Sequence, residues 1–253
     1  MRQEERLSLI LEELASGGSV GVAQLAAKLH VSTASIRRDL HTLEEQRLLT
    51  RTHGGAMANS TVYELPLRYR GGRHRDAKRR IAATAAARVD GHVASVALTG
   101  GTTTTEVARE LAGRKDITVV TNALNIAAEL ALRPELKLIV TGGTARSESY
   151  ELVGPIAEAA LSGMNLDLAI VGVDGVSVSG GLTTYHDIEA HTNEVLISRA
   201  RRVIVVADAS KVGKLAFVRI CALEAVDELI TDVSAPAAEL RALAEAGVTV
   251  TTV

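Results

Sequence analysis

The chain has 253 residues and a formal net charge of −2; 47% of its residues are hydrophobic and only 2% are aromatic. This composition is typical of a soluble globular protein with an aliphatic core, in one large domain or two ordinary ones. It disfavours a base-stacking binder of RNA or single strands, which needs aromatic side chains, and the single cysteine, Cys221, excludes an internal disulfide framework. No apolar run approaches the length of a membrane span and the acid-bearing, amphipathic N-terminus is unlike a signal peptide, so we expect a cytoplasmic protein.

The charge is distributed unevenly along the chain. Residues 81–253 carry 14 Lys or Arg against 21 acids, whereas residues 61–80 carry seven against two. The seven cations of this basic segment are Arg68, Arg70, Arg73, Arg75, Lys78, Arg79 and Arg80. A basic segment ahead of an acidic bulk suggests that only the front of the chain meets a polyanion, although a solvated run of charge gives the same pattern.

Three helices are predicted near the N-terminus. Apolar residues recur there at helical spacing, and Gly-rich or polar breaks separate the three segments, which cover residues 2–15, 22–29 and 33–45. Either Ser32 or Thr33 can cap the third helix. The stretch 50–55 that follows is polar, β-prone and ends in a turn.

The second and third segments match the plan of a helix-turn-helix. Hydroxyls at the start of its second helix suit phosphate oxygens or base edges, and they belong to Ser32, Thr33 and Ser35. Arg37 and Arg38 follow on the outer face, where one can take a guanine edge and the other a phosphate. Arg51 and His53 would form a wing against the DNA backbone or minor groove. A small helical domain for protein contacts is the alternative.

Residues 58–80 are predicted to be a linker between domain 1–57 and domain 81–253. From residue 81 strand-like and helical stretches alternate, which predicts an α/β fold with a mostly parallel sheet covered on both faces. The strands are expected at 93–98, 117–121, 136–141, 166–172, 203–207, 228–231 and 248–251. The helices are expected at 81–89, 104–112, 123–132, 155–163, 187–200 and 235–246.

Three loops rich in Gly and Thr follow predicted strands, at 98–105, 120–122 and 140–144. Ligands of open α/β sheets bind outside the carboxyl ends of the strands, where glycine lets an anion approach the backbone and threonine donates to it. The chain lacks G-x-x-x-x-G-K-[ST] and G-x-G-x-x-G, so a small phosphorylated metabolite fits better than a nucleotide. Ordinary βα turns remain the alternative for each single loop.

The front of the chain resembles the DeoR family of bacterial transcriptional regulators over residues 22–56, VAQLAAKLHVSTASIRRDLHTLEEQRLLTRTHGGA. The specific part of the match runs from Ser32 to Leu40, in the form S-x-x-[ST]-I-R-R-D-L. The resemblance implies an N-terminal winged helix-turn-helix that docks its third helix in the major groove of operator DNA. It also implies a transcriptional regulator, more a repressor than an activator.

Residues 81–232 resemble the sensor domain of the same family, which is similar in fold to ribose-5-phosphate isomerase. The matching motifs include G-T-T at 101–103, V-T-N at 120–122, G-x-D-G at 172–175 and D-x-S-K-x-G at 208–213. The resemblance implies a sugar-phosphate or related effector of a carbohydrate-metabolism operon. The residues expected to bind it are Thr99, Gly101, Thr102, Thr103, Thr104, Asn122, Gly142, Gly143, Asp174, Glu189 and Lys211.

Two positions depart from the family pattern, where many relatives have an acid at Thr99 and a lysine at Asn193. An isomerase or deaminase acting on the same ligand class is one alternative, and it needs a carboxylate base and a carbonyl-polarising cation. Thr99 and Asn193 cannot supply these groups, although Asp174, His186 and Glu189 remain, and we expect no enzyme. We expect no metal or cofactor, because the seven histidines are scattered. A DNA-binding protein whose second domain only oligomerises is a further alternative. One helix-turn-helix reads few base pairs, so a homo-oligomer, dimer or tetramer, is expected.

Overall fold

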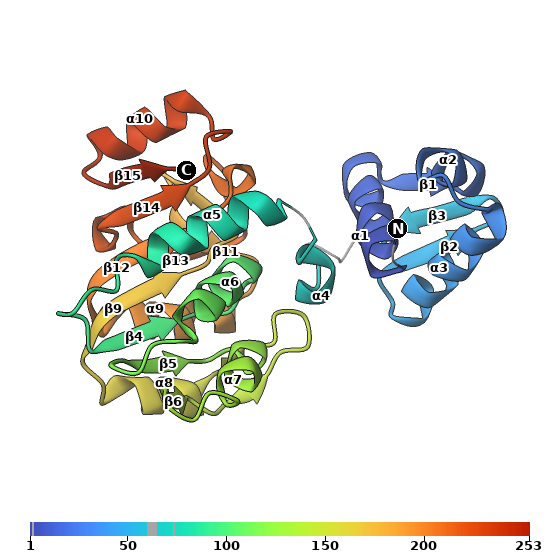
Figure 1. Ribbon diagram of the computed structural model, residues 1–253. Helices are drawn as coiled ribbons and strands as arrows, with labels where there is room; N and C mark the ends of the chain where they lie inside the picture. Colours follow the sequence, from blue (N-terminus) through green and yellow to red (C-terminus); the bar gives the residue numbers. More distant parts are fainter. Residues whose placement is uncertain (2, 60–64, 73) are drawn as a thin grey trace. The chain divides into compact units, whose positions relative to one another are not determined.

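The computed structural model describes residues 1, 3–59, 65–72 and 74–253, and it divides the chain into two compact units, Met1–Arg73 and His74–Val253 (Figure 1). This boundary between the units differs from the predicted linker, which covers residues 58–80. Tyr69 is buried in the core of the first unit, and the first helix of the second unit begins at Arg75, not near residue 81. Arg73 and Glu64 of the basic segment lie outside the described residues.

The first unit is a helix-turn-helix with a small antiparallel sheet. Its elements in chain order are α1 (Gln3–Gly17), β1 (Ser19–Gly21), α2 (Val22–Lys28), α3 (Thr33–Glu45), β2 (Leu49–Thr52), β3 (Gly55–Ala58) and α4 (Leu67–Arg70). The sheet order is β1-β3-β2. The helical stripes meet in one aliphatic core, in which Ile10, Leu25, Ile36, Leu40 and Leu43 are almost fully buried. The burial of each such side chain stabilises the folded unit by about 1.5–3 kcal/mol.

The second unit is built on a seven-stranded parallel sheet in the order β15-β14-β12-β9-β4-β5-β6. The strands are β4 (Ser95–Leu98), β5 (Thr118–Thr121), β6 (Lys137–Val140), β9 (Leu166–Val171), β12 (Ala200–Val206), β14 (Glu228–Thr231) and β15 (Thr249–Thr252). All six neighbouring pairs run parallel. The predicted α/β class with a mostly parallel sheet is therefore confirmed, together with the winged helix-turn-helix in front.

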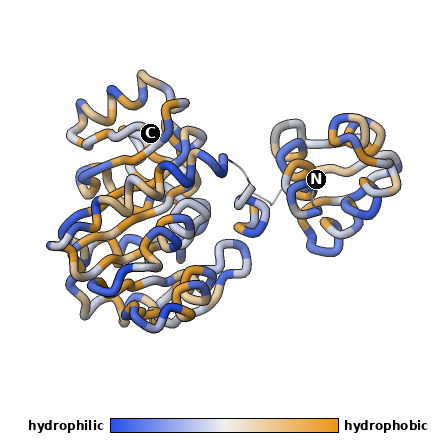
Figure 2. Tube along the Cα trace, viewed as in Figure 1, coloured by the Kyte–Doolittle hydropathy of each residue, from blue (hydrophilic) through white to orange (hydrophobic). Residues whose placement is uncertain are grey.

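Helices cover both faces of this sheet, because successive strand residues point to opposite sides. Val96, Leu98, Ile204 and Val206 pack against α5 (Arg75–Ala86), α6 (Thr102–Leu111) and α7 (Leu124–Leu130). Ala97, Val203 and Val205 pack on the other side with α8 (Pro155–Ser162), α9 (Asp187–Ser198) and α10 (Ala237–Glu245). Figure 2 shows the apolar strands running through the interior of this unit, with polar residues toward its outside.

Short antiparallel strands complete the second unit. β7 (Thr144–Ala145) pairs with β8 (Leu152–Val153), and β10 (Gly175–Ser177), β11 (Gly181–Thr184) and β13 (Val218–Cys221) form a three-stranded sheet. Single helical turns lie at Ala209–Lys211 and Leu223–Ala225. Among the described residues, no helix combines the length and apolar character needed to cross a membrane.

Candidate functional site

The outward surface of α3 carries the two arginines that the sequence marks for nucleic-acid contact. Ser32 is the N-cap of the helix, and its Oγ accepts the N–H of Ser35 at 3.1 Å. Arg37 and Arg38 are exposed, while the apolar stripe of the helix is buried. The Ser32 hydroxyl also lies 3.0 Å from that of Ser35, so both hydroxyls have a partner within the helix start, and Thr33 and the two arginines are exposed in the first turns of α3.

A buried ion pair fixes the orientation of α3. Arg6 on α1 donates from Nη2 to Asp39 Oδ1 at 2.9 Å, and Asp39 is only 1% exposed. The bond joins two helices that lie 33 residues apart in the chain. Asp39 follows Arg38 directly, so this contact within the unit positions the helix that carries the exposed arginines.

The wing is the hairpin formed by β2 and β3. Thr52 pairs with Gly55, which leaves His53 and Gly54 at the exposed tip. Arg51 is exposed on β2, and its Nη1 lies 3.5 Å from Glu44 Oε2 on α3. His53 therefore lies at the tip, while Arg51 links the wing to α3.

In the second unit, the Thr-rich loop forms the start of α6. Its N-cap, Gly101, has φ +131°, a conformation that favours glycine. Thr104 and Thr105 donate from Oγ1 to the carbonyl of Gly101 at 3.0 and 2.6 Å. In the part of the chain that the structure describes, the half-buried Thr102 hydroxyl forms no hydrogen bond, so it is the threonine of this loop best placed for a ligand.

Glu151 lies at the centre of the candidate effector site. Its Oε1 accepts the backbone N–H of Gly100 at 2.9 Å and the side-chain amides of Asn122 and Asn193, each at 3.3 Å. A Cβ on Gly100 would lie 2.4 Å from Glu151 Cγ, so the close approach requires glycine there. Glu151 is 2% exposed and thus joins three separate segments through one internal carboxylate.

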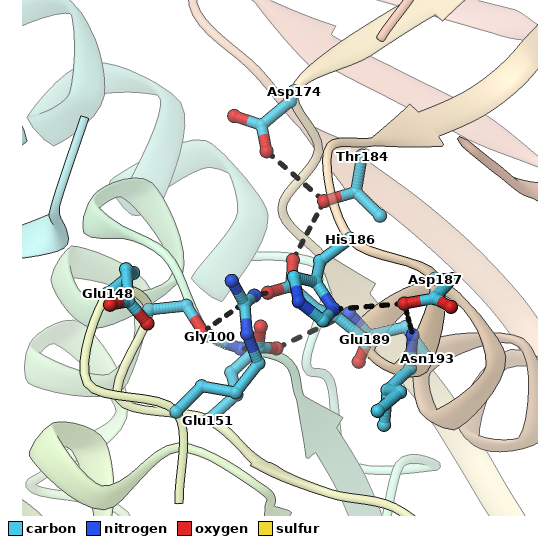
Figure 3. A network of polar contacts seen from close by, with 12 residues as sticks. Gly100, Glu148, Glu151, Asp174, Thr184, His186, Asp187, Glu189 and Asn193 are labelled. Atoms are coloured by element: carbon cyan, nitrogen blue, oxygen red, sulfur yellow. Dashed lines mark hydrogen bonds and ion pairs between the residues drawn. The ribbon is translucent and has the colours of Figure 1, made fainter. Parts of the chain in front are cut away.

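A chain of polar contacts continues from this centre through Glu189 and Thr184 to Asp174 (Figure 3), and from Asp174 to Lys211. Lys211 Nζ donates to Asp174 Oδ1 at 2.9 Å, and Thr184 Oγ1 lies 3.2 Å from Asp174 Oδ2 and 2.8 Å from Glu189 Oε1. Arg146 pairs with the other oxygen of Glu189. Because a hydroxyl has only one hydrogen, the Thr184 contacts are both satisfied when Glu189 is protonated and donates to Thr184.

The pKa of Glu189 supports this assignment of the proton. Burial, with the adjacent Glu151 carboxylate adding to it, raises the pKa of the Glu189 carboxyl from 4.5 to about 8, against the opposing effect of Arg146. Folded protein therefore retains a proton that the unfolded chain loses above pH 4.5. The free energy of unfolding should therefore fall as the pH rises from about 4.5 to 8. Above pH 8 the whole of this loss of stability should be present.

We expect Glu189→Gln to remove this pH-dependent cost, because glutamine keeps the shape and does not ionise. As the pH rises from 5 to 9, the free energy of unfolding of the variant should increase relative to that of the native chain by roughly 1.4 kcal/mol for each unit of pKa shift relieved, and its melting temperature should rise relative to the native one. Thermal melts at both pH values measure the difference. A gap between the two proteins that stays constant with pH would show that Glu189 is ionised throughout.

A cavity of about 770 Å³ lies beside this network. Arg146 lines it and also contacts Glu189, and further lining comes from the starts of α8 and α9, with Pro155, His186 and Ile188. The cavity therefore opens next to the Glu189 end of the network. None of the expected effector residues is among those that line it.

The structure brings together some of the expected effector residues and not others. Asn122, Asp174, Glu189 and Lys211 all belong to the network around Glu151. Thr99 is fully buried, and its Oγ1 accepts the N–H of Gly172 at 3.0 Å. Gly142 and Gly143 lie against α8 and β8 instead.

Sequence reasoning missed two charged residues of the site, Glu151 and Arg146. Both come from the segment between β7 and β8, where no strand was expected. The signal that could have revealed them is an acid directly before the sequence L-V-G-P at 152–155 and an arginine shortly after the third Gly–Thr loop, 140–144. In the described ranges, no group of three His, Cys, Asp or Glu side chains is arranged to hold a metal ion.

Both units of the chain match known protein families, and several curated proteins are similar to the whole chain. Residues 6–62 match the model of the DeoR-like helix-turn-helix domain, and residues 73–233 match the DeoR C terminal sensor domain. The HTH-type transcriptional regulator GlpR of Haloferax volcanii is 38% identical over 99% of this chain and 98% of its own length. The glycerol-3-phosphate regulon repressor of Escherichia coli (strain K12) is 31% identical over 97% of each chain. Ribose 5-phosphate isomerase A of Methanocaldococcus jannaschii aligns over 54% of each chain, with a TM-score of 0.39 and 19% identity.

Proposed function

This chain belongs to the DeoR family of transcriptional regulators, and on that premise we propose that it represses a carbohydrate-metabolism operon and is released from operator DNA by a phosphorylated sugar or related metabolite. The expectation of a regulator and not an enzyme agrees with the relatives, which are transcriptional regulators and repressors. The single observation that carries the proposal is that Arg37 and Arg38 are exposed on α3, whose orientation the Arg6–Asp39 ion pair fixes.

The surface of the first unit supports contact with a duplex. A helix-turn-helix places its second helix in the major groove, with base contacts from the first turns of that helix. Thr33, Arg37 and Arg38 lie in those turns and are exposed. His53 at the wing tip and Arg51 on β2 supply further groups for the backbone or minor groove. One such unit reads only a few base pairs, so we propose a homo-oligomer on repeated half-sites.

The second unit supports an anionic ligand with several hydroxyls. The start of α6 offers backbone amides and the Thr102 hydroxyl to a phosphate. Buried carboxyl groups at Glu151, Glu189 and Asp174 suit hydroxyl donors of a sugar. Because Glu151 already takes the Gly100 amide, the proposed phosphate would bind the later amides at Thr102 and Thr103.

A side-chain acceptor within the network also lacks a partner. Asn122 donates from Nδ2 to Glu151 and to Asn193 Oδ1, at 3.3 and 3.2 Å, which fixes the orientation of its amide. The opposite atom, Oδ1, is buried and has no hydrogen-bond partner among the described residues. An unsatisfied buried acceptor is costly, and a ligand hydroxyl would relieve the cost.

A thermal-shift screen of hexose, pentose and triose phosphates tests the effector class. A ligand that binds only the folded chain stabilises it by about 2.7 kcal/mol at 100 times its dissociation constant. We expect at least one sugar phosphate to raise the melting temperature while the matching unphosphorylated sugar does not. No shift with any phosphate would favour the alternative in which the second unit only oligomerises.

A further inference from the structure

The second unit begins with a band of arginines on α5. On the inward side of this helix, Ile81, Ala82 and Ala85 pack in the core against the sheet, and Lys78 is also buried. Arg75, Arg79 and Arg80 do not lie on that side and are exposed. One acid, Asp76, accompanies them on the exposed side. The outward side of the first two turns is therefore strongly cationic.

These arginines are unlike most others in the same unit, which pair with acids. Arg88 and Arg202 pair with Glu228, Arg109 pairs with Glu106 and Glu129, and Arg114 pairs with Asp116. Within the described ranges, Arg75, Arg79 and Arg80 enter no ion pair and no side-chain hydrogen bond. Among the described residues, three neighbouring guanidinium groups of α5 thus have no internal partner.

The placement of these charges is also unfavourable for the helix itself. Cations are disfavoured in the first turns of a helix, where the backbone dipole is positive. Like charges at spacing i, i+4, as at Arg75 and Arg79, repel. Sequences that break such local preferences often do so at functional positions. An external anion is the simplest partner that would offset both costs.

We propose that Arg75, Arg79 and Arg80 bind phosphate oxygens of the duplex held by the first unit, an inference that rests on the proposed function. Chain connectivity favours this partner. Tyr69 is anchored in the core of the first unit, and Arg75 follows only six residues later, at most about 20 Å along the chain. A duplex bound by the first unit therefore keeps phosphates at high local concentration near α5. A second copy of the acidic unit is the competing partner.

The test compares salt dependence of DNA binding. The probe is a duplex selected by the full chain from a random 40-base-pair pool. Each phosphate contact adds about 0.9 to the slope of log affinity against log salt. We expect the triple variant R75A/R79A/R80A to lose about 2 to 3 units of this slope for each chain bound. Its preference among sequences should not change, because phosphate contacts carry no sequence information.

Two matched variants sharpen the result. R75K/R79K/R80K keeps the charges and should keep the slope. R133A/K137A/K214A removes three exposed cations elsewhere in the same unit and should leave the slope nearly unchanged. Equal losses from both alanine triples would overturn the proposal, because the effect would then reflect net charge alone.

Three further outcomes separate the possible failures. An unchanged slope in R75A/R79A/R80A, with native binding intact, overturns the α5 contact and leaves the proposed function standing. A changed oligomeric state of that variant without DNA, measured by sedimentation, overturns it in favour of contact with a second copy. Failure of the native chain to select any duplex would instead refute the proposed function.

Discussion

Arg37→Ala should weaken binding to the selected duplex by about 1–3 kcal/mol, roughly 5- to 150-fold, because a bidentate arginine–guanine contact contributes that much discrimination. Arg37 is exposed on α3, whose orientation the Arg6–Asp39 pair fixes. The substitution removes no internal contact of the described chain, and alanine is a good helix former. The loss should therefore appear in DNA affinity and not in the melting temperature. Quantitative binding to matched and single-base-changed duplexes measures it.

The pattern of loss across sequences distinguishes a base contact from a phosphate contact. Arg37→Ala should flatten the preference at one base pair, whereas a phosphate contact would weaken all sequences alike. Arg201→Ala is the control, because this arginine is 82% exposed in the other unit. An unchanged footprint for Arg37→Ala would refute the placement of α3 in the groove.

Thr102→Ala and Lys211→Ala should each weaken release by the effector while leaving operator affinity without effector within about twofold. A hydrogen bond to a charged group contributes about 1.5–3 kcal/mol, so the effector concentration needed for half release should rise at least tenfold. Thr102 sits in the first turn of α6, and Lys211 joins the network through Asp174. Titration of preformed DNA complexes with the sugar phosphate found by thermal shift measures the change.

The control substitutions for these variants lie in the second unit, one of them close to Lys211 in the chain. Lys214→Ala removes an exposed lysine three residues after Lys211, and Thr249→Ala removes an exposed threonine on β15. Both should respond to the effector like the native chain. If Thr102→Ala and Lys211→Ala are also released normally, the effector binds elsewhere, and the cavity beside Arg146 becomes the first alternative.

Strong periodic segments of the fold could be predicted from the sequence. The helix 33–45 and the strand 228–231 match α3 and β14 at both ends. β1 was not predicted, because its three residues follow Gly17-Gly18 without any alternation of their own. β10, β11 and β13 were not predicted either, because their antiparallel pairing joins segments up to 40 residues apart.

Much of the candidate site could be predicted, but its central contacts could not. Loops after parallel strands converge at one edge of a sheet, so Asn122 and Asp174 were expected near each other. Glu151 enters the same place from the antiparallel pair β7–β8, which carries no parallel-strand signal. Asn193 was noticed only as a departure from the family pattern, and its hydrogen bonds to Asn122 and Glu151 depend on how α9 packs.

The most direct test of the whole account is reciprocal linkage between DNA and effector. The affinity of the full chain for its selected duplex is measured with and without saturating sugar phosphate, and the affinity for the sugar phosphate is measured with and without saturating duplex. We predict that each ligand weakens the other by the same factor, about 5- to 150-fold. A sugar phosphate that binds the folded chain yet leaves duplex affinity unchanged would contradict the account.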